Sequence, residues 1–307
     1  MNEYRPEGFL LDTPKNIAAL SSQSALMEAC QTRRILEART IVCDSAHNLL
    51  VDLGCMKGII PREEGAIGIR EGTVRDIAII SRVNKPVCFT VQSFETDKYG
   101  KSRAILSRRE AQELCQHAYI STLRCGDIIP ARVTHLDCFG AFTDIGCGIP
   151  SLVPIDSISV SRIEHSRERF SSGMDIRVIV KSIDEDGRIC LSHKELLGTW
   201  TENAARFEHG ETVAGIVRSV EEYGVFVELT PNLAGLAEPR EDVHIGQLAS
   251  VYIKNMIPER MKIKLIIIDT FSESIAPKVP DYYYWGDHMD HFVYSPELSD
   301  RLIESRF

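Results

Sequence analysis

The sequence lacks several features that would assign it directly to a common class of protein. Its nine cysteines include no C-x-x-C pair, which argues against a zinc ribbon and a thioredoxin-like redox motif. No run approaches the roughly 18 apolar residues of a membrane span, and the first residues have no basic stretch before an apolar core. We therefore expect a cytoplasmic protein with free thiols and no membrane partner.

Catalytic motifs are lacking as well. No phosphate-binding Gly-Lys-Thr loop, nucleophile elbow or paired-carboxylate arrangement stands out. We expect no enzymatic activity, no cofactor and no small-molecule substrate.

The sequence also lacks an excess of positively charged residues. Asp and Glu number 44 against 35 Lys and Arg, which gives a net charge of -9. Nonspecific affinity for nucleic acids depends largely on cations that neutralise phosphates, so this composition argues against a protein coated with such side chains. If RNA is the ligand, the positive charge must be local.

What the sequence does contain is an internal repeat. Its length of 307 residues allows two or three globular domains. The segments 126–133 and 139–145 resemble 210–217 and 223–229, and both pairs are offset by 84 residues. A weaker upstream copy has His47 where the others have Phe139 and Tyr223, and Leu50 where they have Phe142 and Phe226. We call these copies repeats one, two and three in chain order.

Short runs rich in Val, Ile and Phe alternate with Gly, Asp and Asn within each copy, which is typical of a small β-barrel. Because successive side chains of a strand point to opposite faces, alternation predicts which residues are buried. The expected inward residues are Ala141, Thr143, Ile145, Ile189, Leu191, Val225, Val227, Leu229, Ile263 and Leu265. The expected outward residues are Phe142, Asp144, Arg188, Phe226, Glu228, Lys262 and Lys264.

Repeats two and three therefore present aromatic rings and a cation on the outside. Taken singly, Phe142 or Phe226 is more simply explained as a packing residue at a barrel end or against a neighbouring repeat. The recurrence of the whole arrangement favours a ligand site. Bases of single-stranded RNA stack on aromatic side chains for roughly 1–3 kcal/mol each, while cations hold the backbone.

The pattern aromatic-Gly-small-Phe, then Ser-Leu-Val, then Ile-Asp-x-x-x-Arg-Ile-x-Leu-Ser at 183–192 resembles the S-one RNA-binding domain of ribosomal proteins. The resemblance covers about 34–270 and implies a mainly β fold: three tandem five-stranded OB-fold barrels joined by short α-helical linkers. A helical N-terminal extension and an aromatic-rich C-terminal tail complete the expected architecture. It also implies binding of single-stranded messenger RNA and association with the small ribosomal subunit. A ribosome-associated regulator or protein-binding adaptor with reduced RNA affinity is the alternative.

The family also implies which side chains contact RNA. In repeat two these are Phe139, Phe142, Asp184 and Arg188, and in repeat three Tyr223, Phe226 and Lys262. Three positions depart from the pattern: Pro154 and Glu238 replace a histidine, and Pro258 replaces the aspartate of repeat three. Because Glu238 would weaken phosphate binding, we expect repeat three to bind RNA less tightly or to recognise something other than plain single strands.

Repeat one has lost the stacking residues. Its candidates for weak RNA contact or docking are His47, Leu50 and Arg103, and the family resemblance favours docking. A barrel retained only for stability is the open alternative.

The expected segments are an N-terminal extension at 1–33, repeats at 34–113, 124–197 and 208–271, and a tail at 272–307. Linker helices are predicted at 108–123 and 194–207, and Thr13-Pro14 marks the start of an N-terminal helix. In the tail, Ser295-Pro296 predicts a short helix that bears Leu298, Leu302 and Ile303. The tail aromatics are expected either to pack on repeat three or to anchor the tail on a ribosomal or protein partner. A metal site at His288 and His291 is a minor alternative, since no further ligand is evident; we expect no metal.

Overall fold

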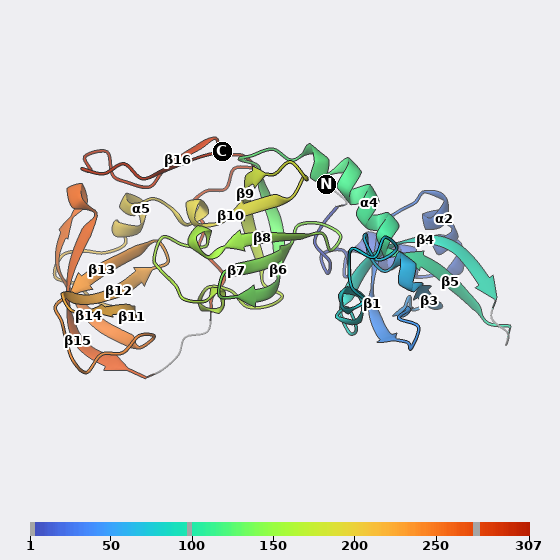
Figure 1. Cartoon of the computed structure of the whole chain (residues 1–307), viewed down its shortest axis with the longest axis horizontal. Coiled ribbons are helices and arrows are strands. Elements are labelled where there is room, and N and C mark those ends of the chain that lie inside the picture. Colours follow the sequence, from blue (N-terminus) through green and yellow to red (C-terminus); the bar gives the residue numbers. More distant parts are fainter. Residues whose placement is uncertain (1–3, 97–99, 273–276) are drawn as a thin grey trace. The chain divides into compact units, whose positions relative to one another are not determined.

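Strands dominate the computed structural model, which describes residues 4–96, 100–272 and 277–307 (Figure 1). They close into three five-stranded barrels within these residues, one for each repeat, as expected for tandem OB-folds. The chain divides into two compact units, residues 1–123 with 144–150, and residues 124–143 with 151–307.

Barrel one belongs to the first unit. Its strands follow the order β1-β2-β3-β5-β4, in which β3 and β5 are parallel and the other described pairs are antiparallel. They are β1 (Leu36–Cys43), β2 (Leu49–Asp52), β3 (Lys57–Ile60), β4 (Pro86–Thr96) and β5 (Ser102–Ser107). A 3-10 turn, η1 (Arg62–Glu64), and α3 (Ile77–Ile80) lie between β3 and β4.

Two helices precede this barrel, α1 (Pro14–Leu20) and α2 (Gln23–Gln31). Thr13 caps α1 as predicted, since its hydroxyl accepts the backbone N–H of Asn16. Leu26 and Ala29 share one core with the strands of barrel one. The N-terminal extension therefore packs on repeat one.

A buried charge cluster ties the start of the chain into the first unit. The Glu7 carboxylate lies 2.6 Å from Arg108 Nε and 3.1 Å from Arg82 Nη1. The backbone N–H of Glu7 donates to Asp144, which also accepts from the N–H of Gly146. Asp144 is therefore buried, and the prediction that it faces outward is wrong. It closes the turn after its strand, and burial, with the Glu7 charge, raises its pKa to about 7.

Glu37 lies in the same cluster. Its Oε2 accepts the backbone N–H groups of Gly8 and Leu10, each at 3.0 Å. Burial, and then the charge of Glu7, raise the pKa of Glu37 to about 8. This carboxyl is consequently largely protonated at neutral pH.

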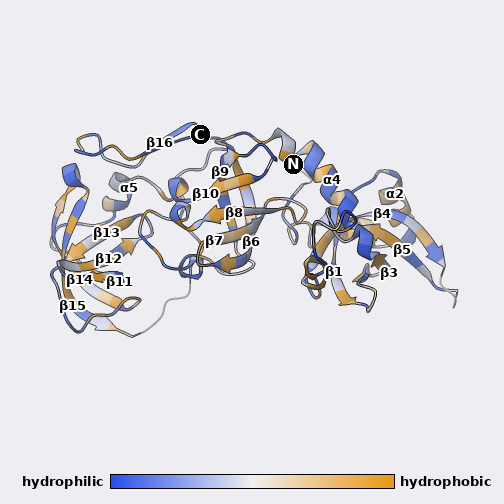
Figure 2. Cartoon of the chain, in the orientation of Figure 1, coloured by the Kyte–Doolittle hydropathy of each residue, from blue (hydrophilic) through white to orange (hydrophobic). Residues whose placement is uncertain are grey.

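Helix α4 (Arg108–Ala118) and the 3-10 turn η2 (Ile120–Thr122) follow barrel one and confirm the first predicted linker. Ser107 caps α4 by accepting the N–H of Glu110. In Figure 2 most of α4 is hydrophilic, whereas hydrophobic residues are concentrated on the strands. Only one side of the helix, including Ala111 and Cys115, is buried.

Barrels two and three lie in the second unit, apart from the β7–β8 connection. Barrel two has the order β10-β8-β7-β6-β9, and barrel three has the order β11-β12-β13-β15-β14. The strands of barrel two are β6 (Ile128–Asp137), β7 (Gly140–Asp144), β8 (Pro150–Pro154), β9 (Asp175–Ile183) and β10 (Ile189–Ser192). Those of barrel three are β11 (Thr212–Glu221), β12 (Gly224–Thr230), β13 (Leu233–Ala237), β14 (Leu248–Ile257) and β15 (Lys262–Phe271). Three 3-10 turns accompany them, η3 (Ile155–Ser157), η4 (Ser166–Glu168) and η6 (Pro258–Arg260).

The second predicted linker helix is two short pieces, η5 (Lys194–Leu197) and α5 (Trp200–Ala204). A capping box interrupts it: the Thr199 hydroxyl accepts the N–H of Glu202, whose carboxylate accepts the N–H of Thr199. Trp200 and Ala204 pack into the core of barrel three.

The short helix predicted after Ser295-Pro296 is not formed. The tail instead forms the antiparallel strands β16 (His291–Val293) and β17 (Glu304–Arg306) with a loop between them. The Tyr294 N–H donates to Ile303 O, and the Ser295 hydroxyl accepts the Ile303 N–H rather than capping a helix. Burial of Tyr294 in the core of barrel three fixes both ends of this loop and overrides the local helix signal.

Strand alternation predicts most of the buried residues correctly. Val225, Val227, Ile263 and Leu265 are buried as expected. In barrel three the register shifts between Glu228 and Thr230, so both of these side chains are buried, whereas Leu229 is half-buried. The prediction that Glu228 faces outward is wrong because a bulge changes the alternation there.

No helix in the described part of the chain is long and apolar enough to cross a bilayer.

Candidate nucleic-acid interface

Two exposed aromatic pairs occupy equivalent places on barrels two and three. Phe139, in the turn before β7, is 50% exposed, and its ring meets that of Phe142 edge to face at 5.7 Å. Tyr223 is 66% exposed and meets Phe226 edge to face at 6.1 Å. In each pair the β-strand ring is half-buried and the turn ring stands in solvent. The edge-to-face contact fixes the rings and leaves aromatic surface open for a base.

The glycine inside each pair is required by a close backbone approach. Gly140 and Gly224 both have a φ of 156°. A Cβ at Gly140 would lie 2.4 Å from the carbonyl oxygen of Val153, and one at Gly224 would lie 2.5 Å from that of Ala237. Any larger residue would push the aromatic strand away from its neighbour.

The predicted cation of barrel two, Arg188, is exposed to solvent. The side chain of Arg188, immediately before β10, is 80% exposed and lies 3.5 Å from the Asp186 carboxylate. In this barrel β8 lies between β10 and the Phe142 strand, β7. Asp184 accepts the backbone N–H of Arg188 at 2.7 Å, so its carboxylate shapes the turn that presents Arg188.

In barrel three the strand register places a second lysine in line with the aromatic pair. Phe226 pairs with Leu236, and Leu236 pairs with Lys264. Side chains paired across neighbouring strands share a face of the sheet, so these three form one outward row. Lys262, the predicted contact residue, is also exposed at the start of β15. Alternation places Lys264 outside, but only the pairing of β13 with β15 brings it beside Phe226.

His135 is a further residue that sequence reasoning missed. Its ring lies 6.1 Å from that of Phe142, tilted by 36°, on the neighbouring strand β6. The side chain is 68% exposed. Barrel two therefore groups three rings. The position of His135 on the strand that precedes β7 is the sequence signal that could have identified it.

The departures from the family pattern have clear positions. Glu238 is 82% exposed and lies 3.5 Å from Lys254 Nζ. Pro154 ends β8 and is half-buried. Pro258 begins the 3-10 turn η6, which replaces the turn that Asp184 forms in barrel two.

Barrel one has an aliphatic row where barrel three has aromatic and cationic side chains. Leu50 pairs with Ile59, and Ile59 pairs with Ile105; all three are half-buried. His47 lies 3.3 Å from Asp76, and Arg103 lies 3.0 Å from Glu95. These two side chains are engaged in ion pairs with neighbouring carboxylates.

The two tail histidines do not converge. His288 contacts Asp127 at 2.7 Å and Asp290 at 3.0 Å, and these hydrogen bonds raise its pKa. His291 contacts Glu304 instead, at 2.7 Å. Within the described residues no group of three or more His, Cys, Asp or Glu side chains is placed to hold a metal ion.

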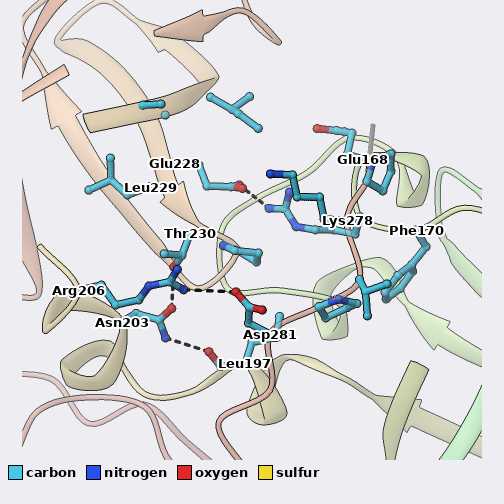
Figure 3. A pocket seen from close by; sticks show the side chains of 18 of the residues that line it. Glu168, Phe170, Leu197, Asn203, Arg206, Glu228, Leu229, Thr230, Lys278 and Asp281 are labelled. Carbon is cyan, nitrogen blue, oxygen red and sulfur yellow. Dashed lines mark hydrogen bonds and ion pairs between the residues drawn. The ribbon is translucent and has the colours of Figure 1, made fainter. Parts of the chain in front are cut away.

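A separate cavity of about 340 Å³, lined by both charged and apolar side chains, lies in the second unit (Figure 3). Its charged groups are largely paired with one another: Glu228 accepts from Arg169, and Arg206 lies 3.7 Å from Asp281. The Asn203 side chain donates to Leu197 O and accepts from the Thr230 hydroxyl. Because these partners satisfy each other, we interpret the cavity as structural rather than as a ligand site.

Comparison with known proteins identifies the family of this chain. Residues 122–194, which include all of barrel two, match the S1 RNA binding domain. The chain is 28% identical to the small ribosomal subunit protein bS1 of Staphylococcus aureus (strain COL) over 286 residues, covering 90% of this chain and 68% of that protein. It is 31% identical to a bS1 homolog of Bacillus cereus over 268 residues, covering 83% of this chain and 66% of that protein. A solved multidomain protein of Streptococcus pneumoniae with nucleic acid binding domains covers 77% of this chain and 74% of its own, at 15% identity and a TM-score of 0.25.

The matched domain and the bS1 relatives identify an S1-type RNA-binding protein. The chain belongs, with its tandem barrels, to the family of the small ribosomal subunit protein bS1.

Proposed function

We propose that this chain binds single-stranded RNA, and messenger RNA in particular, through barrels two and three, and that it associates with the small ribosomal subunit. One observation supports the RNA sites most directly: each barrel holds an edge-to-face pair of rings, of which the turn ring is exposed, and an exposed cation at the start of its last strand. The contact residues would be Phe139, Phe142 and Arg188 in barrel two. In barrel three they would be Tyr223, Phe226 and Lys262, joined by Lys264.

Two further residues have supporting roles in this proposal. Asp184 acts by holding the turn that presents Arg188, through the hydrogen bond between its carboxylate and the Arg188 N–H. His135 extends the ring cluster of barrel two.

Barrel one has a different role in this proposal. The row of Leu50, Ile59 and Ile105 has no ring for a base and no cation for a phosphate, whereas a half-exposed aliphatic row suits contact with a protein. We propose that barrel one docks the chain on a protein surface of the small subunit. The same row also supports the alternative function, an adaptor with little RNA affinity.

Titration of the whole chain with a fluorescent oligo-U or A-rich strand tests RNA binding. For single strands the logarithm of the binding constant should fall with the logarithm of salt concentration by about 0.7 for each phosphate contacted. Absence of binding at low salt, together with cosedimentation with small subunits that survives ribonuclease, would establish the adaptor instead.

A further inference from the structure

The C-terminal tail lies against the aromatic face of barrel three. A groove of about 650 Å³ is lined on one side by Phe226 and Lys262 and on the other by Ser299, Asp300 and Arg301 of the tail. Phe226 and Lys262 are the side chains that the sequence predicts as RNA contacts. The volume is in the range of about 300–1,000 Å³ that is typical of sites for small molecules.

We propose that the tail completes the RNA-binding groove of barrel three and that Arg301 contacts a phosphate of the bound strand. The inference rests on the proposed function, since it assigns a further binding residue to the same site.

Several contacts hold the tail loop rigidly beside the groove. The Tyr294 hydroxyl donates to Asn232 O at 2.6 Å, and the Tyr294 N–H donates to Ile303 O at 2.9 Å. The Asp300 N–H donates to Glu259 O at 3.0 Å. Arg301, next in sequence, is thus presented from a loop that is already ordered. Ordering a loop opposes binding, and here that cost is largely absent.

The charges of the groove favour an anion. Arg260, Lys262 and Arg301 line it together with the carboxylates of Glu259 and Asp300, so its net charge is positive. Among the described residues none of these three cations has an ion-pair partner. The chain as a whole is acidic, so unpaired cations beside an aromatic pair concentrate positive charge where RNA is expected to lie.

If the tail loop served only to cover barrel three, apolar contacts between the loop and the barrel core would be sufficient. Tyr294 and Ile303 provide these by packing on the core of barrel three. They leave the charged segment between them, including Arg301, at the groove. Arg306 offers a matched control, because it is a tail arginine too, lies outside the groove residues and pairs with Glu304 at 3.0 Å.

The test compares Arg301→Ala with Arg306→Ala in the full chain, by anisotropy titration of fluorescent oligo-U at several salt concentrations. We expect Arg301→Ala to lower affinity about three- to tenfold and to reduce the magnitude of the salt slope by about 0.7, and Arg306→Ala to change neither. Arg301→Lys should retain most of the affinity. Equal effects of Arg301→Ala and Arg306→Ala, or tighter binding by Arg301→Ala, would overturn the proposal, and the latter would mean that the tail obstructs the groove.

A double-mutant cycle locates the contact. The Arg301→Ala effect should be coupled to Phe226→Ala and additive with Phe142→Ala, because only Phe226 shares the groove. Coupling to neither ring would contradict the assignment to barrel three. If the unmodified chain binds no RNA, the proposed function fails rather than this assignment alone.

Discussion

Barrels one and three have the same strand order but opposite surface chemistry at one place. The row Leu50, Ile59 and Ile105 of barrel one corresponds to Phe226, Leu236 and Lys264 of barrel three. The barrel core tolerates either row because these side chains point outward and contribute little to its packing. Ile59 and Leu236 are both aliphatic, so the family fold fixes where a ligand would lie, while the two outer positions of the row decide whether that surface suits a nucleotide or a protein.

The two units differ in their interiors as well. The first unit buries the carboxyl groups of Glu7, Glu37 and Asp144 with Arg108 and Arg82. The cavity of the second unit instead pairs Glu228 with arginines, so that its buried charges are balanced. The stability of the first unit should therefore depend on the protonation of Glu37 and Asp144, whose pKa values are raised to about 8 and about 7.

The largest expected effect sharpens this contrast between the units. Because the folded pKa of Glu37 is about 8, above its usual value of 4.5, the folded state binds more protons than the unfolded state between these values. The unfolding free energy of the first unit should thus fall as pH rises from about 4.5 to about 8 and then level off, by about 2–5 kcal/mol in total. Glu37→Gln should abolish the part of this fall above about pH 7 and lessen it below, where Asp144, with a pKa of about 7, also contributes. Hydrogen exchange of the β1 amides, with those of β12 as the reference, measures the difference. Identical pH profiles for the variant and the parent chain would show that Glu37 is ionised in the fold.

The second prediction compares the aromatic rings of barrels two and three with the aliphatic row of barrel one. Phe142→Ala and Phe226→Ala should each weaken binding of oligo-U by about 1–3 kcal/mol, because each ring stacks a base. Leu50→Ala should leave RNA affinity unchanged. Fluorescence titration measures the affinity, and thermal melting provides the control, since half-buried rings outside the core should cost little stability. A collapse of the melting temperature would identify the rings as packing residues.

The third prediction concerns the cation that the strand pairing adds to barrel three. Lys264→Ala should reduce the magnitude of the salt slope by about 0.7 and weaken binding at low salt, as expected for one phosphate contact. Lys57→Ala is the matched control, because Lys57 lies on β3 of barrel one and is paired with Asp52 at 3.1 Å. A salt slope that Lys264→Ala leaves unchanged would remove this residue from the interface.

The smallest expected effect concerns Glu238. Glu238→Gln removes an exposed negative charge and frees Lys254, so RNA affinity should rise by less than about 1 kcal/mol. The gain should diminish as salt is added, because exposed charges are screened. Glu259→Gln, in the groove of the tail, should act in the same direction. If both substitutions leave affinity unchanged at low salt, neither carboxylate lies near the bound strand.

Much of this architecture followed from the sequence. The offset of 84 residues between copies reflects one barrel and its linker, and the three barrels are formed as expected. Alternation identified the exposed aromatic pairs because a barrel has an apolar interior and strands have a period of two. It failed at Glu228, where a bulge shifts the register, and at Asp144, where the turn requires a buried acceptor.

Other features depended on contacts between distant segments. Lys264 joins Phe226 only through β13, and Arg301 reaches the groove only because Tyr294 holds the tail on barrel three. The predicted tail helix failed for the same reason, since those contacts outweigh a capping signal of about 1 kcal/mol. Sequence alone therefore determined the repeat, the barrel class and the side chains that face outward, because these follow from local alternation and spacing. Tertiary structure alone decided which outward side chains lie together. Strand pairing and long-range packing set the distances between these side chains, and those distances cannot be read from how far apart the residues are in the sequence.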